Sequence, residues 1–212
     1  MTQLNNSLNG VDLEQLRRRF ELGFDGTARE HWDFGSSWRH ENRDGNKSFG
    51  AVIGNNGGNP RAVLIPEPID YSSDDFDAVM SFRDQKKQFS LAYHASLFDN
   101  NQGSFGWENP YNSINGWTPV VVGFPNGEGQ AGGPPENQFH QVSAAGGWNF
   151  SGTMRLDGDL AYGRMTQDDD YLPYTINPAL AATITQPLPR GSLDARIDTT
   201  LGNLRLSGRP TD

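Results

Sequence analysis

Two aspartates on one side of a predicted strand are the first residues of this sequence whose types and spacing could do chemistry. In the stretch "MRLDGDLAYGRM", residues 154–165, Asp157 and Asp159 lie two positions apart, so an extended chain carries both carboxylates on one face, about 7 Å apart. That separation lies within the range of a glycosidase acid pair. Arg155 shares their face, however, so the simpler interpretation is a solvated face with charges of both signs.

Other residues that could hold a metal or act in catalysis are weaker candidates. The four histidines fall on different predicted strands or strand ends with no metal-binding spacing. Roles as polar residues that line the lumen of a β-barrel or lie at a membrane interface are therefore favoured over metal binding. They are His31, His40, His94 and His140. Asp168, Asp169 and Asp170 offer oxygen ligands of the kind that calcium takes, but three successive loop acids are more simply solvated. The Asp-Gly pair at Asp44 indicates a turn. With no G-x-S-x-G elbow and no phosphate-cradling glycine loop, we expect no catalytic residue, no metal site and no enzyme.

Composition excludes several further classes of protein. The net charge of −9 and the scattered basic residues argue against a nucleic-acid partner. The absence of cysteine excludes disulfides and covalent C-x-x-C-H haem attachment to this chain. No apolar run reaches the length of a transmembrane helix, and the N-terminal residues lack the apolar region of a secretory signal. Only 34% of residues are hydrophobic, yet 11% are aromatic, which argues against disorder.

The elements that carry these residues are predicted to be strands. After about Leu16 the apolar residues recur at spacing two, over about seven stretches. These stretches cover residues 16–24, 31–42, 75–83, 88–98, 138–150, 154–165 and 193–206. In the last, the apolar parity changes at Gly202 and Asn203, which predicts a β-bulge. Short turns alternate with long connections, among them one of about thirty residues from Arg43 and one of about forty from Asp99.

This alternation predicts an all-β protein, namely an antiparallel up-and-down transmembrane β-barrel segment with short turns at one end and long loops at the other. Residues 1–15 form an N-terminal tail or partial strand, and residues 16–212 form the barrel segment. A soluble β-sandwich remains an alternative, since its strands also alternate. Aromatic residues near strand ends suggest interfacial girdles; these are Trp32, Phe98, Trp148, Phe150 and Tyr162.

Alternate positions along a strand point to opposite sides of the sheet, so the odd-numbered and even-numbered residues of each strand can be assigned to different faces. The residues predicted to face lipid are Trp32, Phe34, Trp38, Phe76, Phe82, Phe89, Leu91, Tyr93, Trp148, Leu156, Leu160 and Tyr162. The residues predicted to line the lumen and contact its occupant are Asp33, Arg39, Glu41, Asp77, Arg83, Arg155, Asp157, Asp159, Asp194, Arg196 and Asp198.

A family resemblance rests on long, ordered segments. They are "HWDFGSSWRHENRDGNKSFGAVIG", "FSLAYHASLFDNN", "FGWENPY", "NQFHQVSAAGGWNFSGTMRLDGDLAYGRMTQDDDYLPYT" and "LPRGSLDARIDTTLGNLRLSGRP". From about Arg17 to Pro210 the sequence resembles the MtrB/PioB family of decaheme-associated outer-membrane β-barrel proteins. None of these segments is a catalytic signature, and the cysteines that some family members carry near the mature N-terminus have no counterpart here.

What the resemblance implies is a barrel of two dozen or more strands that sheathes a periplasmic multihaem c-type cytochrome and supports electron transfer across the bacterial outer membrane. The haem then belongs to the cytochrome, lipid surrounds the barrel, and an extracellular cytochrome at the loops is a further implied partner. About seven strands cannot close such a barrel, so we expect an internal fragment of a longer protein. The alternatives are a porin or transport barrel without a cytochrome and a soluble secreted β-sandwich binding module.

Overall fold

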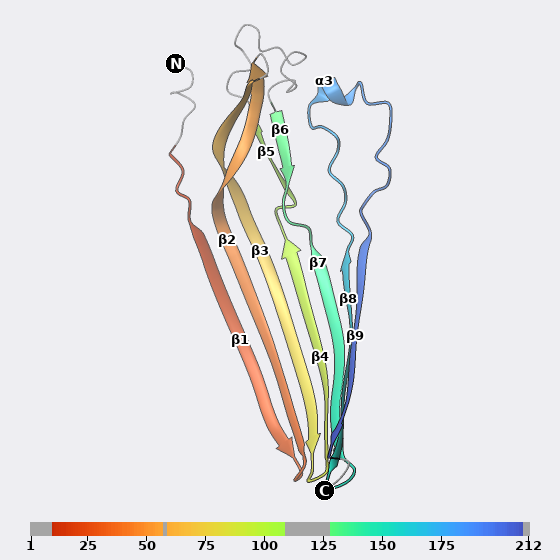
Figure 1. Ribbon diagram of the computed structural model, residues 1–212. Helices are drawn as coiled ribbons and strands as arrows, with labels where there is room; N and C mark the ends of the chain where they lie inside the picture. Colours follow the sequence, from red (N-terminus) through yellow and green to blue (C-terminus); the bar gives the residue numbers. More distant parts are fainter. Residues whose placement is uncertain (1–9, 57–58, 109–127, 210–212) are drawn as a thin grey trace.

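The computed structural model describes residues 10–56, 59–108 and 128–209 and is built almost entirely of antiparallel strands. The elements are β1 (Gln15–Ala28), β2 (Trp32–Asn56), β3 (Asn59–Arg83), β4 (Lys87–Asn100), β5 (Ser104–Glu108), β6 (Glu128–Gly132), β7 (Asn137–Asn149), β8 (Met154–Gln167), α3 (Pro178–Ala181) and β9 (Ala195–Gly208). A seven-stranded sheet has the order β1-β2-β3-β4-β7-β8-β9, and β5 and β6 form a second, two-stranded sheet (Figure 1). The predicted all-β up-and-down topology is confirmed, and the barrel is not closed by these strands. Among the described residues, no helix has the length and apolar character needed to cross a membrane.

The strand register sorts side chains onto two faces. Trp38 pairs with Leu22 of β1 on one side and with Phe76 of β3 on the other. Leu156 pairs in the same way with Trp148 of β7 and Leu206 of β9. Because directly opposed residues point to the same side of a sheet, these pairings collect most of the large apolar side chains on one face and leave the other face mainly polar.

The connections differ in length between the two ends of the sheet. Short turns join β1 to β2, β3 to β4 and β7 to β8 at the lower end in Figure 1. In the β3–β4 turn, the Asp84 carboxylate accepts hydrogen bonds from the backbone N–H groups of Lys86 and Lys87, at 2.7 and 2.6 Å. These two bonds lower the pKa of Asp84.

The predicted loop of about thirty residues after Arg43 is wrong. β2 and β3 are each 25 residues long and continue as one hairpin far beyond their neighbours. The Asp-Gly pair at Asp44 is therefore inside β2 and forms no turn. Residues 57–58 of the glycine-rich tip lie outside the described residues.

The extended hairpin is held by the second sheet, which belongs to the long connection after Asp99. The Phe49 ring packs edge-on against Phe105 of β5 with centroids 4.9 Å apart, and the Trp107 Nε1–H donates to the Val52 carbonyl at 3.0 Å. Nearby, Ala51 and Ile69 are among the few fully buried apolar residues. Tertiary packing thus keeps as strand a segment that its Gly, Asn and Pro content predicts as loop. Residues 109–127 of this connection lie outside the described residues.

β9 also differs from the prediction. Its ladder with β8 runs without a register shift from the Met154–Gly208 pair to the Gln167–Ala195 pair, so the expected bulge at Gly202 is absent from this described ladder. The register instead opposes Leu204 to Gly158 and Asp198 to Arg164. The apolar residues of β9 therefore lie on both faces.

Gly45 is the one described glycine with a positive φ, at 128°. A Cβ at this position would lie 2.1 Å from the carbonyl oxygen of Glu14, the residue directly before β1 begins. Asn46 N–H donates to that same carbonyl at 2.8 Å. Glycine therefore permits both the backbone conformation and the close contact at the point where β2 leaves β1.

We predict that Gly45→Ala destabilises the folded protein by about 1–3 kcal/mol, because it combines an unfavourable φ with this clash. Gly50→Ala, in the same strand with nothing within 4 Å of its added Cβ, is the matched control. Urea unfolding in detergent micelles, followed by the loss of heat-modifiable migration on gels, measures the difference. Equal midpoints for the two variants would show that the Gly45 conformation imposes no constraint.

Candidate functional site

The polar face of the sheet is concave and is the candidate functional site; it is called the inner face below. A single groove of about 510 Å³ on this face is lined by side chains from every main-sheet strand except β1. Asp33 of β2 and Arg205 of β9 both line it, although four strands separate β2 from β9 in the sheet order. Such a shared groove requires the sheet to curl with its polar face inward.

Most charges on the inner face are paired with one another. The Arg17 guanidinium lies 2.5 Å from the Glu41 carboxylate, which Arg43 also approaches at 3.5 Å. Neighbouring strands contribute Arg39 with Asp75, at 3.4 Å, and His94 Nδ1 with Asp77, at 2.8 Å. On β8, Arg155 lies 2.6 Å from Asp157. The side chains come from adjacent strands or from positions i and i+2 of one strand, so the alternation itself brings them together.

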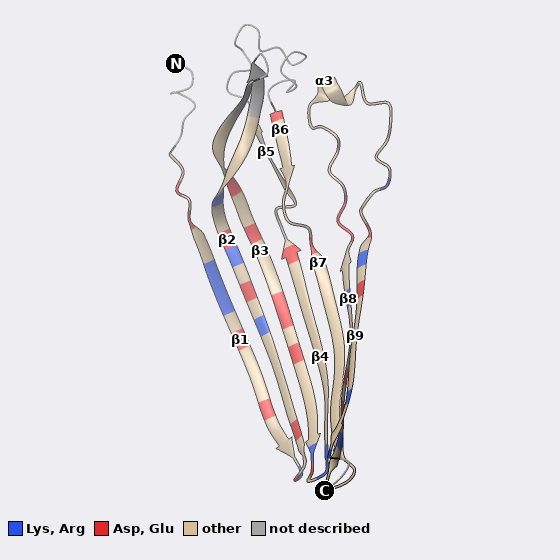
Figure 2. Ribbon diagram, in the orientation of Figure 1, with Lys and Arg blue, Asp and Glu red and all other residues tan. Residues whose placement is uncertain are grey.

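The charges form two zones separated by a neutral strip. Figure 2 shows charged residues recurring along β1, β2 and β3 and again on β8 and β9. β7 carries no Asp, Glu, Lys or Arg, and β4 carries Lys87 and Asp99 only near its two ends. The inner face of these two strands consists largely of small residues, namely Ser90, Ala92, Ser143, Ala145 and Gly147. A partner surface can therefore approach the backbone most closely along this strip.

The opposite face, called the outer face below, carries the large apolar side chains. The Trp32 and Phe82 rings lie 5.0 Å apart, and Phe20 packs edge-on against Trp38 at 5.7 Å. Many of these side chains are exposed, with Leu160 at 58% and Leu204 at 79%. A continuous exposed apolar surface of this kind is typical of contact with a membrane or a partner and is rare on soluble monomers.

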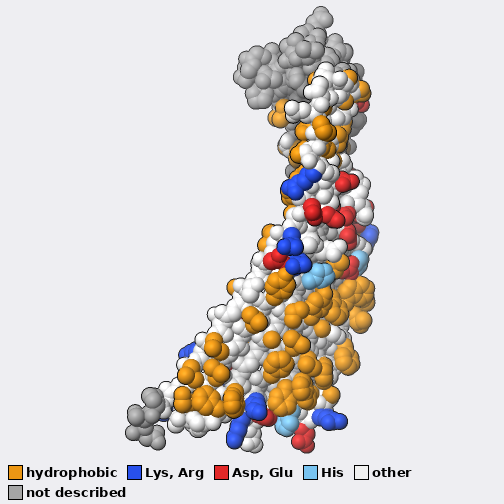
Figure 3. All heavy atoms as spheres, turned by 90° about the vertical axis from the view of Figure 1, so that its right-hand side faces the viewer, with side chains coloured by type: hydrophobic (Ala, Val, Ile, Leu, Met, Phe, Trp, Pro, Cys, Tyr) orange, Lys and Arg blue, Asp and Glu red, His pale blue; other side chains and the backbone are white. Residues whose placement is uncertain are grey.

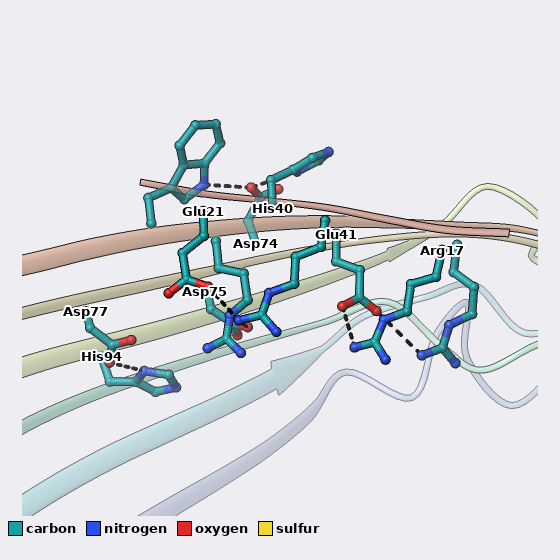
Figure 4. Close-up of polar contacts among 12 residues, drawn as sticks. Arg17, Glu21, His40, Glu41, Asp74, Asp75, Asp77 and His94 are labelled. Carbon is teal, nitrogen blue, oxygen red and sulfur yellow. Dashed lines mark hydrogen bonds and ion pairs between the residues drawn. The ribbon is translucent and has the colours of Figure 1, made fainter. Parts of the chain in front are cut away.

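The apolar outer face ends in a band of polar contacts toward the long connections. Asp74 accepts a hydrogen bond from Trp38 Nε1–H at 2.8 Å and lies 2.9 Å from His40 Nδ1. The Tyr93 hydroxyl lies 2.8 Å from His140 Nδ1. Figure 4 shows His40 and Asp74 on the opposite side of the sheet from Glu41, Asp75 and Asp77.

The same band continues on the last two strands. Asp198 accepts hydrogen bonds from the Tyr162 hydroxyl and from Arg164 Nε–H, both at 2.7 Å, and Arg196 Nε lies 2.9 Å from it. Aromatic rings with polar tips beside His, Arg and Asp are typical of a membrane–water boundary. Sequence reasoning missed Asp74 and Arg164, although they alternate in step with the apolar residues of their strands. For His140 it left a lumen-lining and an interfacial role open, and the register places His140 on the outer face.

The register brings all of the residues predicted to face lipid onto the outer face. It places a subset of the predicted lumen residues on the inner face, namely Asp33, Arg39, Glu41, Asp77, Arg83, Arg155, Asp157 and Asp159. That one face meets lipid and the other a lumen occupant stays a prediction at this point.

The predicted lumen positions of the last stretch are wrong. Arg196 and Asp198 pair with Thr166 and Arg164 of β8. These two β8 residues share a face with Tyr162, so Arg196 and Asp198 lie on the outer face. Asp194 precedes β9 and has a φ of 48° outside any strand. The girdle prediction for Phe98 is also wrong, since Phe98 pairs with Ser73 on the inner face and packs against Tyr71 at 5.4 Å.

No group of side chains that could hold a metal ion is found among residues 10–56, 59–108 and 128–209. Their His, Asp and Glu side chains form no group of three or more with metal-binding geometry. Asp157, the first member of the possible acid pair, is engaged with Arg155, and Asp159 accepts a hydrogen bond from Asn203 Nδ2 at 2.9 Å.

Two comparisons with known proteins agree with this architecture. The family model of outer membrane beta-barrel porins, MtrB/PioB, matches residues 1–212. The chain is 26% identical over 212 residues to "Outer membrane protein MtrB" of Shewanella baltica (strain OS185). The match covers 100% of this chain and 27% of that protein, so the chain spans about a quarter of the length of the curated relative.

Single cysteines test the assignment of faces, including the corrected register of β9. Because the chain has no native cysteine, it contributes no background labelling. In the protein reconstituted in lipid nanodiscs, we predict that Asp159→Cys and Leu201→Cys react quickly with a charged thiol reagent. Leu160→Cys and Thr200→Cys, their neighbours on the outer face, react at least about tenfold more slowly, because the thiolate form is disfavoured in lipid. Fast labelling at Thr200→Cys together with protection at Leu201→Cys would restore the bulged register.

Proposed function

The chain belongs to the MtrB/PioB family of outer-membrane β-barrel porins, and from this premise we propose that it forms part of the wall of a wide barrel that sheathes a multihaem c-type cytochrome. Its outer face then contacts lipid, its inner face contacts the cytochrome, and electrons cross the outer membrane along the haems of that partner. The barrel itself is not an enzyme in this proposal. It holds the redox protein in place and insulates it from the membrane.

The main support for the proposal is the number of strands in this chain compared with the share of its relative's length that the chain covers. The main sheet has seven strands, and the chain matches 27% of the length of its relative. At the same density of strands, a complete barrel has about two dozen or slightly more, which lies at the upper end of the range for outer-membrane barrels. With strands about 4.8 Å apart and tilted by about 40°, such a barrel is roughly 50 Å across between backbones.

A barrel of this width has room for a folded protein. Porins with 16–18 strands leave only an aqueous channel. An inner diameter of roughly 50 Å, less the side chains on both walls, still exceeds the roughly 30 Å of a small domain. The backbone also favours a continued sheet, because each unpaired N–H or C=O at the β1 and β9 edges costs several kcal/mol in lipid.

The chemistry of the two faces supports the same function. The inner face is polar, with paired charges around a neutral strip of small residues, and suits contact with water or with another protein surface. Any covalently attached c-type haem must belong to a partner, because this chain has no cysteine to attach it. An extracellular cytochrome near the long connections extends the same proposal to the other end of the barrel.

Proteoliposomes test the proposal directly. We predict that vesicles containing the barrel and a periplasmic multihaem cytochrome allow an enclosed reduced dye to be oxidised by an external iron(III) chelate. Vesicles with either protein alone show only background oxidation, because electrons need haems close enough to hop between and a barrel that places them across the bilayer. Stopped-flow absorbance of the dye measures the rate.

The alternative function is a porin or transport barrel without a cytochrome. It predicts steady ion conductance by the barrel alone in planar bilayers and no gain in dye oxidation when the cytochrome is added. That pair of results would overturn the sheath proposal and leave the outer-membrane barrel intact.

A further inference from the structure

An apolar groove interrupts the outer face close to the short-turn end. Its volume is about 490 Å³, its walls include Phe89, Trp148, Leu156 and Leu204, and its floor is formed by Gly146 and Gly158. All of these residues lie on the outer face according to the register. Figure 3 shows hydrophobic side chains gathered over the lower part of the molecule, above a rim of charged side chains at its lower end.

The groove exists because two glycines oppose each other across β7 and β8. Gly146 pairs with Gly158, whereas the next outer-face positions carry Trp148 and Leu156. Neither glycine has a positive φ, so the backbone does not require glycine there. Glycine weakens a strand interior and often marks a place that a ligand approaches closely.

There is room for a side chain at the first of these positions. A Cβ added to Gly146 would lie 3.5 Å from the Gln88 carbonyl oxygen and 4.0 Å from Phe89 Cδ2, which is ordinary van der Waals contact. Steric hindrance therefore does not require glycine at position 146, and the groove is empty because the sequence has no side chain there. In lipid, an unfilled apolar groove forfeits dispersion contacts that a flexible hydrocarbon chain can supply.

The ammonium group of a lysine side chain lies beside the groove. Lys87 lines it, and the Lys87 Nζ lies 5.9 Å from the centroid of the Trp148 ring. Asp84 is the nearest acid in the same turn, and its carboxylate already accepts the backbone N–H groups of Lys86 and Lys87. Lys87 begins β4 directly after the short β3–β4 turn, and short turns mark the periplasmic side of outer-membrane barrels. A long cationic side chain at that end can reach the lipid phosphates of the periplasmic leaflet.

We infer that this groove binds one acyl chain of a phospholipid of the periplasmic leaflet, with the lipid phosphate at Lys87. The hydrocarbon fills the space above Gly146 and Gly158, and the walls of Phe89, Trp148, Leu156 and Leu204 enclose it on its sides. The ammonium group and the anionic phosphate are complementary in charge. The site depends on the outer-membrane location of the barrel and is independent of any cytochrome.

Photo-crosslinking tests the site in the reconstituted protein. The probe is phosphatidylglycerol with a diazirine in the middle of one acyl chain, mixed into phosphatidylethanolamine vesicles, with labelled peptides identified by mass spectrometry. We expect wild-type labelling to concentrate on peptides around residues 146–148 and 156–158, relative to the equally apolar outer face of β2. Gly146→Leu fills the groove and lowers labelling there about fivefold, as expected for one or two displaced methylene groups.

Matched variants separate the groove from the general lipid surface. Ala144→Leu adds the same side chain two residues away on the same face of β7 and leaves the labelling unchanged. Lys87→Gln reduces labelling by phosphatidylglycerol, and Lys87→Arg retains it, because the phosphate requires a cation at this position.

A measurement on the wild-type protein does not depend on whether a variant folds. Native mass spectrometry of the delipidated wild-type protein is expected to show retained phospholipid. Uniform labelling of the whole outer face, or crosslinks to a second copy of the protein in place of lipid, would overturn the inference. Neither outcome bears on electron transfer, so this test and the proteoliposome test fail independently.

Discussion

The hydrogen-bond ladder between neighbouring strands is the constraint on which the rest of this structure depends. In a membrane no water satisfies backbone N–H and C=O groups, so each strand must be paired along its length by the next. Pairing fixes the register, and the register fixes which side chains face each way. The ladders of the main sheet therefore determine, before any side-chain contact is considered, that Trp38 lies with Phe76 and Asp77 with His94.

Side-chain interactions then distinguish regions along each face. On the outer face, apolar side chains give way to the hydrogen bonds of Asp74, His140 and Asp198 where the strands leave the apolar zone. Among the described strands of the main sheet, β2 and β3 continue beyond that band as a long hairpin, and Phe105 of β5 packs there against Phe49. The same alternation thus produces an exposed apolar surface in one part of the hairpin and a packed core in another.

The sequence predicts the face of each side chain correctly where the apolar residues of a strand keep to alternate positions, and it fails where they do not. In β8, Leu156, Leu160 and Tyr162 share one parity, and their common face was predicted correctly. In β9, Ile197 and Leu201 have the opposite parity to Leu204 and Leu206, so hydrophobicity alone cannot choose the register. The choice rests on partners in β8, above all on Arg164 and Tyr162 for Asp198. The extended hairpin was missed for the same kind of reason, since its strand character depends on residues about fifty positions away.

The pairing of inner-face charges fits the proposed protein-filled lumen better than it fits a selective pore. Channels select ions with rings of side chains of one sign, whose fields add along the path of the ion. Here Glu41 lies between Arg17 and Arg43, and Asp157 is bound by Arg155, so opposite charges cancel within a few ångströms. Such a face exerts little net field on a passing ion, yet it stays wettable and can exchange individual pairs for contacts with a partner. Together with the neutral strip of β4 and β7, it suits a wall that accommodates a large polar surface more than one that filters small solutes.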